Sequence, residues 1–459
     1  MIMEKKNLYK KIFMVSLPIV IQNILDAAVN SADVLMMNYV GQTELSAVSL
    51  ASQIGMVIFM FLFGFGSGVV ILAAQYWGKK DLEAIHRIQG IALRFILIVA
   101  AIGAALCMFA PRLLMKIYTD DETLIALGSD YLRIFSVAII FWSLCTVYGS
   151  TLRSVERVTI VTVVEVLALL LNVGLNATFI FGLLGVPKLG VVGVALATSL
   201  SRFIEFIICV IISVCSKDVK LKFKYMFVKS PSLTSDFMKM AFPAILNDVA
   251  WGTAFSMYSV IFGHLGEDVV AANSITSTVR GLGTTLCYGL GSATGIILGP
   301  ILGAGRIEEG KKTARTLLNA SWLSGAIGSL IIVAIYPFAV ATANLSETAL
   351  YYLKFMLKVN VVYIIGTAVN TTLIAGVFRA GGNTRWGLIC DVIDMWVYAV
   401  PLGFIAAFAL KLPVPVVYIL LCTDEFVKWP WVFKYYKSGK WAANITRDFG
   451  RNEKGEISA

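Results

Sequence analysis

The feature that most constrains this sequence is its series of long apolar segments, of which residues 45–77 and 88–111 are two examples. Each is longer than the roughly 20 residues that a helix needs to cross the hydrocarbon core of a bilayer. Strands of a membrane barrel would be about 10 residues long and would alternate in polarity. Only 14% of the 459 residues are charged, against about 25% in an average soluble protein. The sequence therefore predicts an all-α polytopic membrane protein.

Twelve such segments follow one another along the chain, joined by connections of alternating charge. The predicted spans lie near residues 13–39, 46–77, 88–110, 124–150, 159–182, 189–214, 237–264, 270–302, 314–340, 348–377, 385–410 and 413–434. Most basic residues of the connections gather on one side of the predicted membrane. Because basic connections stay in the cytoplasm, we expect a multi-pass protein of the plasma membrane with both termini cytoplasmic. Short basic clusters between spans also explain the net charge of +10 without a nucleic-acid partner.

A long basic segment near the middle of the chain separates two halves that resemble each other. Sliding the chain by 225 residues pairs Pro18 with Pro243 and Gly64 with Gly289. Both halves hold six spans and run in the same direction, which predicts two pseudo-symmetric six-helix bundles with a cavity between them. We expect an N-lobe at residues 1–215, a cytoplasmic linker at 216–235, a C-lobe at 236–440 and a cytoplasmic tail at 441–459.

The first span combines apolar side chains with a polar stripe. On a helix, Gln22, Asp26, Asn30 and Asp33 fall within about 80° of one another. A hydrogen-bonded seam between helices would account for the amides, but an ionised carboxylate in a bilayer costs several kcal/mol unless it is paired, hydrated or protonated. We interpret the stripe as a water-lined site where Asp33 or Asp26 binds a proton or a cation, with Gln22 and Asn30 lining the substrate cavity.

The second half carries aromatic residues at the positions that match the stripe. The shift of 225 residues aligns Asp26, Asn30 and Asp33 with Trp251, Phe255 and Tyr258, and Asn23 with Asp248. Aromatic faces stack on flat ligands and attract cations; the alternative is that these rings only pack against neighbouring helices. We expect Asp248, Trp251 and Tyr258 to contact substrate in the C-lobe.

Further polar pairs lie inside predicted spans. Asn172 and Asn176 are four residues apart, and Asp391 and Asp394 are three apart, so each pair shares one helix face. We expect Asp391 and Asp394 to line the substrate cavity of the second half. Side chains nearer the span ends are interpreted as snorkelling residues or local salt bridges: Glu165, Arg202, Glu205, Asp424, Glu425 and Lys428.

The sequence contains no motif typical of an enzyme. Its two histidines, His86 and His264, lie at predicted span ends and form no HExxH pair, and neither a phosphate-binding loop nor a Gly-x-Ser-x-Gly turn is present. We therefore predict that the chain is not an enzyme and has no cofactor. Any active transport would then draw on an ion gradient or on a separate partner.

Several segments together resemble the multidrug and toxic compound extrusion (MATE) transporters of prokaryotes. They include LPIVIQNILDAAVNSADVLMMNYVGQTELSAVSLAS, GFGSGVVILAAQYWGKKD, GLGSATGIILGPILGAGR and GVFRAGGNTRW. The resemblance covers nearly the whole chain. It implies twelve helices in two six-helix lobes that form a V around a central cavity. It also implies export of cationic or amphipathic compounds in exchange for H+ or Na+.

The resemblance also assigns roles to individual residues. Asp33 matches the acidic residue of the family's first helix, which is tied to cation or proton coupling, and Asn172 matches an asparagine of the same N-lobe site. Asn176 stands where the family often has aspartate, which lowers the charge of the site. Some members carry a glutamate in the seventh helix where this chain has Trp251, with Asp248 one turn earlier. Asp33, Asp26, Asn172 and Asn176 are thus the candidate coupling residues, with a possible Na+ at Asp33 and no other metal.

The sequence therefore predicts a secondary-active exporter of cationic or amphipathic small molecules that works by alternating access between two lobes. One alternative is a flippase of lipid-linked or polysaccharide substrates from the same broad superfamily, which would favour a large basic cavity. Another is a membrane sensor that does not transport. We expect the protein to be a monomer in the bilayer.

Overall fold

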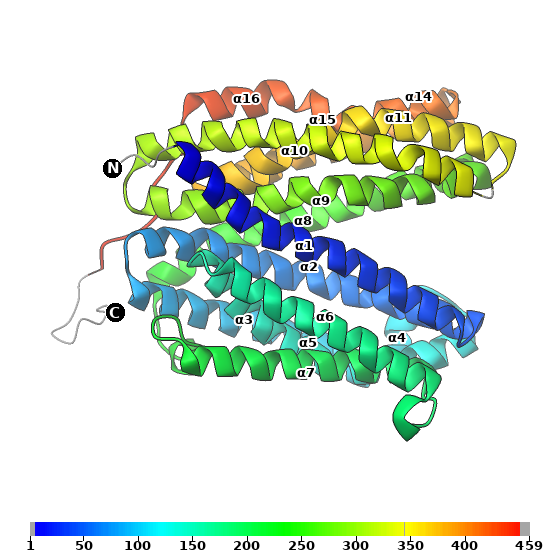
Figure 1. Ribbon diagram of the computed structural model, residues 1–459, viewed down its shortest axis with the longest axis horizontal. Coiled ribbons are helices and arrows are strands. Elements are labelled where there is room, and N and C mark those ends of the chain that lie inside the picture. Colours follow the sequence, from blue (N-terminus) through cyan, green and yellow to red (C-terminus); the bar gives the residue numbers. More distant parts are fainter. Residues whose placement is uncertain (1–4, 344, 450–459) are drawn as a thin grey trace. The chain divides into compact units, whose positions relative to one another are not determined.

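A computed structural model describes residues 5–343 and 345–449, and this part of the chain is helical without strands (Figure 1). The helices of the first half are α1 Lys5–Asn38, α2 Gln42–Gly78, α3 Leu82–Phe109, α4 Pro111–Lys116, α5 Glu122–Ser154, α6 Val158–Phe181, η1 Leu183–Gly185, α7 Gly190–Cys215 and η2 Phe223–Met226. Those of the second half are α8 Pro231–Leu265, α9 Glu267–Gly303, α10 Ile307–Thr342, α11 Glu347–Asn370, η3 Thr371–Phe378, α12 Thr384–Asp391, η4 Val392–Ala399, α13 Val400–Phe404, η5 Ile405–Ala409, α14 Val414–Cys422, α15 Asp424–Val427 and α16 Trp429–Ser438.

The helices form two compact units. The N-terminal unit comprises Ile21–Ile245 and the chain from Arg447 onwards, and the C-terminal unit comprises the chain up to Val20 and Leu246–Thr446. In the N-terminal unit α5 packs against α2, α3 and α7, and in the C-terminal unit α9, α10 and α11 pack against one another (Figure 1). The last ten residues of the predicted tail lie outside the described part of the chain.

The prediction of an all-α polytopic membrane protein is confirmed by these helices. Among the described residues, ten helices are long and apolar enough to cross a membrane. The predicted seventh and twelfth spans are also helical, but they fall outside these ten. The seventh lies on α8, which carries Asp236, Lys239 and Asp248; the twelfth is divided into the short helices α14, α15 and α16. Large apolar side chains such as Phe13 and Val397 are exposed, which suits a lipid-facing surface.

The paired glycines of the sequence repeat occupy matching places in the two units. In the N-terminal unit, a Cβ at Gly64 of α2 would overlap Ile245 of α8. In the C-terminal unit, a Cβ at Gly289 of α9 would overlap Val20 of α1. The shift of 225 residues relates both members of one contact to both members of the other. Both glycines therefore serve close helix packing, which is the common use of glycine in membrane helices.

The basic segment 216–235 packs against α3. A Cβ at Gly90 would overlap the backbone of Tyr225, and the Tyr225 hydroxyl donates a hydrogen bond to Glu83 at 2.7 Å. Arg94 Nε donates to the Met226 carbonyl oxygen at 2.9 Å. The segment thus forms part of the N-terminal unit.

Two spans of the C-terminal unit change from α-helical to π-helical winding. η3 begins directly after Asn370, and η4 begins directly after Asp391 and contains Asp394. Such turns are uncommon and occur frequently at functional sites. Here they fall where polar side chains are buried in the unit.

Candidate ion and substrate sites

The polar site of the N-terminal unit is centred on Asp33 of α1. Its carboxylate accepts a hydrogen bond from the Asn176 amide of α6 at 2.8 Å. The same amide group donates to Asn172 Oδ1 at 3.3 Å, and the Asn172 amide donates to the Thr198 hydroxyl at 3.4 Å. Asn176 is only 1% exposed. The structure thus brings together three predicted site residues from two helices.

No basic side chain of the described residues forms an ion pair with Asp33. Its hydrogen-bond partner is the neutral amide of Asn176, which supplies no compensating charge. A carboxylate at membrane depth is costly in its ionised form unless a proton, a cation or water compensates it. Among the described residues, the charge of Asp33 therefore has no basic side chain to compensate it.

The end of the predicted stripe nearer the N-terminus has charged and amide neighbours instead. Arg153 of α5 donates to Gln22 at 3.3 Å and forms an ion pair with Glu165 at 2.7 Å. Arg202 pairs with Glu205 at 2.7 Å, so the expected salt bridges do form. Asp26 has neither a hydrogen bond nor an ion pair with any residue that the structure describes. The side chain of Asn30 lies outside the described residues.

Aromatic side chains surround a cavity in the C-terminal unit. The rings of Trp251 and Phe255 on α8 have centroids 4.5 Å apart, and both line a cavity of about 200 Å³ together with Tyr288 and Tyr363. Tyr258 donates a hydrogen bond to Asp424 at 3.1 Å. Trp251 therefore faces open space, whereas the hydroxyl of Tyr258 already has a partner.

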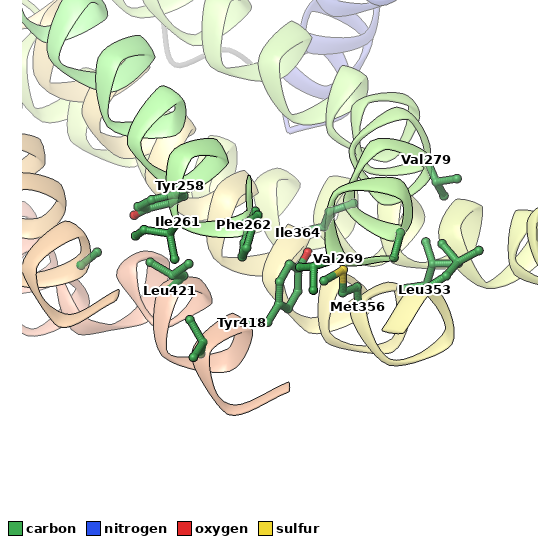
Figure 2. Close-up of a cluster of buried hydrophobic side chains, with 14 of the residues drawn as sticks. Tyr258, Ile261, Phe262, Val269, Val279, Leu353, Met356, Ile364, Tyr418 and Leu421 are labelled. Atoms are coloured by element: carbon green, nitrogen blue, oxygen red, sulfur yellow. The ribbon is translucent and has the colours of Figure 1, made fainter. Parts of the chain in front are cut away.

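A buried hydrophobic cluster lies next to this cavity. Figure 2 shows Tyr258, Ile261 and Phe262 of α8 beside Leu421 and Tyr418 of α14 within the cluster. Tyr418 is 1% exposed, and its hydroxyl accepts a hydrogen bond from Asn360 at 2.6 Å. Phe255 lines the cavity and packs against this cluster.

The acids predicted in the eleventh span belong to a charged network around Lys428. The Lys428 ammonium lies 3.1 Å from Asp394, 3.4 Å from Asp391 and 3.5 Å from Glu425. Glu425 also accepts hydrogen bonds from Thr367 at 3.0 Å and from the Asn370 amide at 2.6 Å. Lys428 is 4% exposed and Asp394 is fully buried. One cation thus compensates three carboxylates.

A second basic residue extends this network to α8. Arg379 forms an ion pair with Asp248 at 3.0 Å and donates a hydrogen bond to Asn247 at 2.7 Å. The Asn247 amide in turn donates to Asp391 at 2.7 Å. The charge of Asp248 is therefore paired with Arg379 within the protein. Trp251, by contrast, lines the cavity.

Three functional candidates of the C-terminal unit were not singled out from the sequence as site residues: Arg280, Arg379 and Lys428. Apart from Glu425, which pairs with Lys428 three residues away, their partners lie on other helices and are not revealed by spacing along one helix. Arg280 carries the one available signal, a basic residue inside a span with no acid three or four positions away on the same helix. The described part of the chain contains no group of side chains suited to bind a metal ion tightly.

Membrane-length helices arranged in two compact units define a polytopic membrane protein. The sequence profile of the MatE family matches residues 18–178 and 243–405, more than half of the chain. The chain belongs to the MATE family of multidrug efflux transporters. Its sequence relatives include the probable multidrug resistance protein YoeA of Bacillus subtilis, 22% identical over 97% of this chain and 96% of that protein. Another is the probable multidrug resistance protein NorM of Rhizobium meliloti, 25% identical over 86% and 85%.

Solved structures share the fold. An outward-facing multidrug resistance MATE family transporter of the MOP superfamily has a TM-score of 0.85 at 21% identity and covers 94% of this chain and 96% of its own. A MOP superfamily transporter from Pyrococcus furiosus has a TM-score of 0.84 at 20% identity with the same coverage. The family resemblance predicted from the sequence is therefore confirmed.

Proposed function

We propose that this protein exports cationic or amphipathic small molecules by antiport against H+ or Na+. The observation that carries the proposal is the Asp33 carboxylate, which has an amide but no basic side chain as partner among the described residues. An acid of this kind within a membrane span is typical of an ion or proton pathway. The multidrug resistance proteins among the relatives support export as the direction of transport.

In the proposed cycle, Asp33 is the residue that takes up the coupling ion from outside. An incoming H+ or Na+ compensates its charge, and the site then attracts a cationic substrate less strongly. The substrate leaves, the site then opens to the inside instead of the outside, and the ion is released there. Asn172 and Asn176 hold the carboxylate in place and supply oxygen ligands, while Asp26 and the amides of Gln22 and Asn30 keep the helix face hydrated.

In this proposal the substrate cavity of the C-lobe includes Trp251 and Tyr258, with the carboxylates of Asp248, Asp391 and Asp394 behind them. Their pairing with Arg379 and Lys428 makes these acids a fixed part of the cavity's charge. The protein would act as a monomer in the plasma membrane with both termini in the cytoplasm and without a cofactor.

The substitution Asp33→Asn tests the proposal in cells that lack other exporters. We expect loss of efflux of a cationic dye, while the variant reaches the membrane at the normal level. Asp130→Asn is a matched control, because Asp130 is an exposed acid on α5 paired with Arg133 at 3.3 Å. Normal dye efflux by Asp33→Asn would refute the coupling role.

A further inference from the structure

The half-buried Arg280 of α9 has surroundings unlike those of three other arginines in the helices. Arg153, Arg202 and Arg379 each pair with a carboxylate at 3.0 Å or less. Arg280 instead lies with its guanidinium carbon 5.5 Å from the ring centroid of Phe255 and 5.8 Å from that of Tyr363. It forms no hydrogen bond and no ion pair with the residues that the structure describes.

Contact with aromatic rings compensates only part of what a guanidinium needs. Cation–π attraction acts on the charge, but it uses none of the five N–H donors that an arginine presents in a fixed plane. Those donors match the two oxygens of a carboxylate or a similar anion. An arginine held by rings therefore keeps its hydrogen-bonding edge for another partner.

Arg280 lines two cavities of the C-terminal unit. The larger, of about 200 Å³, is bounded by Trp251, Phe255, Tyr288 and Tyr363. The smaller, of about 30 Å³, shares Phe255, Arg280 and Tyr363 with it and reaches the hydrophobic cluster of Figure 2. The larger space far exceeds the roughly 10–15 Å³ that one water occupies. Flat aromatic walls around it favour a planar ligand.

The acid in the wall of the larger cavity does not compete for Arg280. Glu425 accepts hydrogen bonds from Thr367 and Asn370 and lies 3.5 Å from the Lys428 ammonium. Its charge is thus engaged by its own neighbours. In this cavity the Glu425 carboxylate is paired with its neighbours, whereas the N–H donors of Arg280 have no acceptor among the described residues. The cavity is therefore suited to a ligand with a negatively charged group.

We propose that this cavity binds the anionic group of a planar aromatic compound. Arg280 holds the carboxylate or sulfonate, and Trp251, Tyr288 and Tyr363 contact the ring system. The inference makes Arg280 the residue of the C-terminal unit that recognises an anionic group on a compound carried by the proposed exporter. It rests on the proposed function only in treating such a ligand as cargo.

Two probes with the same ring system and opposite charge test the proposal: naphthalene-2-sulfonate and 2-naphthylmethylammonium. Their dissociation constants are measured by calorimetry on the purified full-length protein. A charge-assisted hydrogen bond contributes enough that its loss costs at least about tenfold in affinity. We therefore expect Arg280→Gln to reduce the preference for the sulfonate over the ammonium probe by about tenfold or more, and Arg280→Lys to keep part of it.

Two further variants separate binding from folding. Ser277→Asp keeps Arg280 and places an acid one turn before it in the same cavity, so it should also weaken sulfonate binding. Arg385→Gln removes an exposed arginine of the same unit and should change neither affinity. An unchanged probe preference in both Arg280→Gln and Ser277→Asp would overturn the proposal, as would equal weakening of both probes.

The calorimetric result does not depend on transport. Loss of the sulfonate preference supports the site whether or not Asp33 couples an ion. Normal efflux of a cationic dye together with no sulfonate binding by the unsubstituted protein would overturn this inference and leave the proposed function intact.

Discussion

The two units differ in how acids within their spans are buried and paired: Asp26 and Asp33 of the N-terminal unit are half-buried, whereas the acids around Lys428 in the C-terminal unit are buried. In the N-terminal unit the one hydrogen-bond partner of Asp33 among the described residues is the amide of Asn176, and Asp26 forms no hydrogen bond or ion pair with them. In the C-terminal unit Asp391, Asp394 and Glu425 share the ammonium of Lys428. An acid with its own cation is structurally satisfied, whereas an acid without one responds to ions from outside. Under the proposed function, the first unit couples ion movement to export, and the second holds a fixed charge network around Lys428.

The largest expected effect comes from removing the cation of the second unit. Lys428→Met leaves three buried carboxylates without compensation and should lower the free energy of unfolding by about 3–5 kcal/mol. Arg153→Met is the counterpart in the N-terminal unit and should cost less, about 1–3 kcal/mol, because it leaves one half-buried acid. Thermal unfolding in detergent measures both. A smaller loss of unfolding free energy for Lys428→Met than for Arg153→Met would contradict the proposed difference between the two units.

The next prediction compares one acid from each unit. Glu425→Gln removes a partner of Lys428 and weakens the bonds from Thr367 and Asn370, so stability should fall by about 1–3 kcal/mol. Asp33→Asn removes a charge that no cation compensates, so stability should stay the same or rise slightly. The melting temperatures of the two purified variants, each compared with that of the original protein, measure these changes in stability. Equal destabilisation by both would show that Asp33 has a structural role like that of Glu425.

A third variant adds an acid to the N-terminal site. Asn176→Asp places a second carboxylate beside Asp33 and gives Na+ another oxygen ligand. Na+ at about ten times its dissociation constant would then stabilise the protein by about 1.4 kcal/mol. Melting in sodium chloride is compared with melting in choline chloride. The same difference between the two salts for the variant and the original protein would argue against a cation site at this position.

The smallest effect is expected for Asp26. It lies two helical turns from Asp33, about 10 Å along the axis, and no recorded contact joins the two side chains. Asp26→Asn should therefore reduce dye efflux by less than about tenfold, which corresponds to about 1.4 kcal/mol. Initial rates of dye efflux in cells measure this reduction. A complete loss of efflux would make Asp26 a coupling residue equal to Asp33.

The sequence predicts the membrane helices well because hydrophobicity is a property of each segment alone. The contact of Asp33 with Asn176 joins α1 to α6, and only the resemblance to known transporters suggested it. The repeat aligned Asp33 with Tyr258 and thereby indicated that the second half lacks acids at this place. Asp424 approaches Tyr258 from a different helix, and no alignment within one chain reveals such a replacement.

Lys428 and Arg280 show the limit of reasoning along a single helix. The spacing of Glu425 and Lys428 suggested a local pair, and that pair exists, but Asp391 and Asp394 reach the same ammonium from another span. The breaks between α14, α15 and α16 and the π-helical turn of η4 also change the direction of side chains in ways that a regular 100° period does not describe. Partners that depend on such irregular winding require coordinates.

The most direct test of the central claim is dye transport in proteoliposomes driven separately by a pH gradient and by a Na+ gradient. The protein should accumulate a cationic dye with at least one of the two gradients, and Asp33→Asn should lose this accumulation under both. Asp130→Asn should behave like the original protein. Gradient-driven accumulation by Asp33→Asn at the original rate would contradict the claim that the uncompensated acid of the N-terminal unit couples ion movement to export.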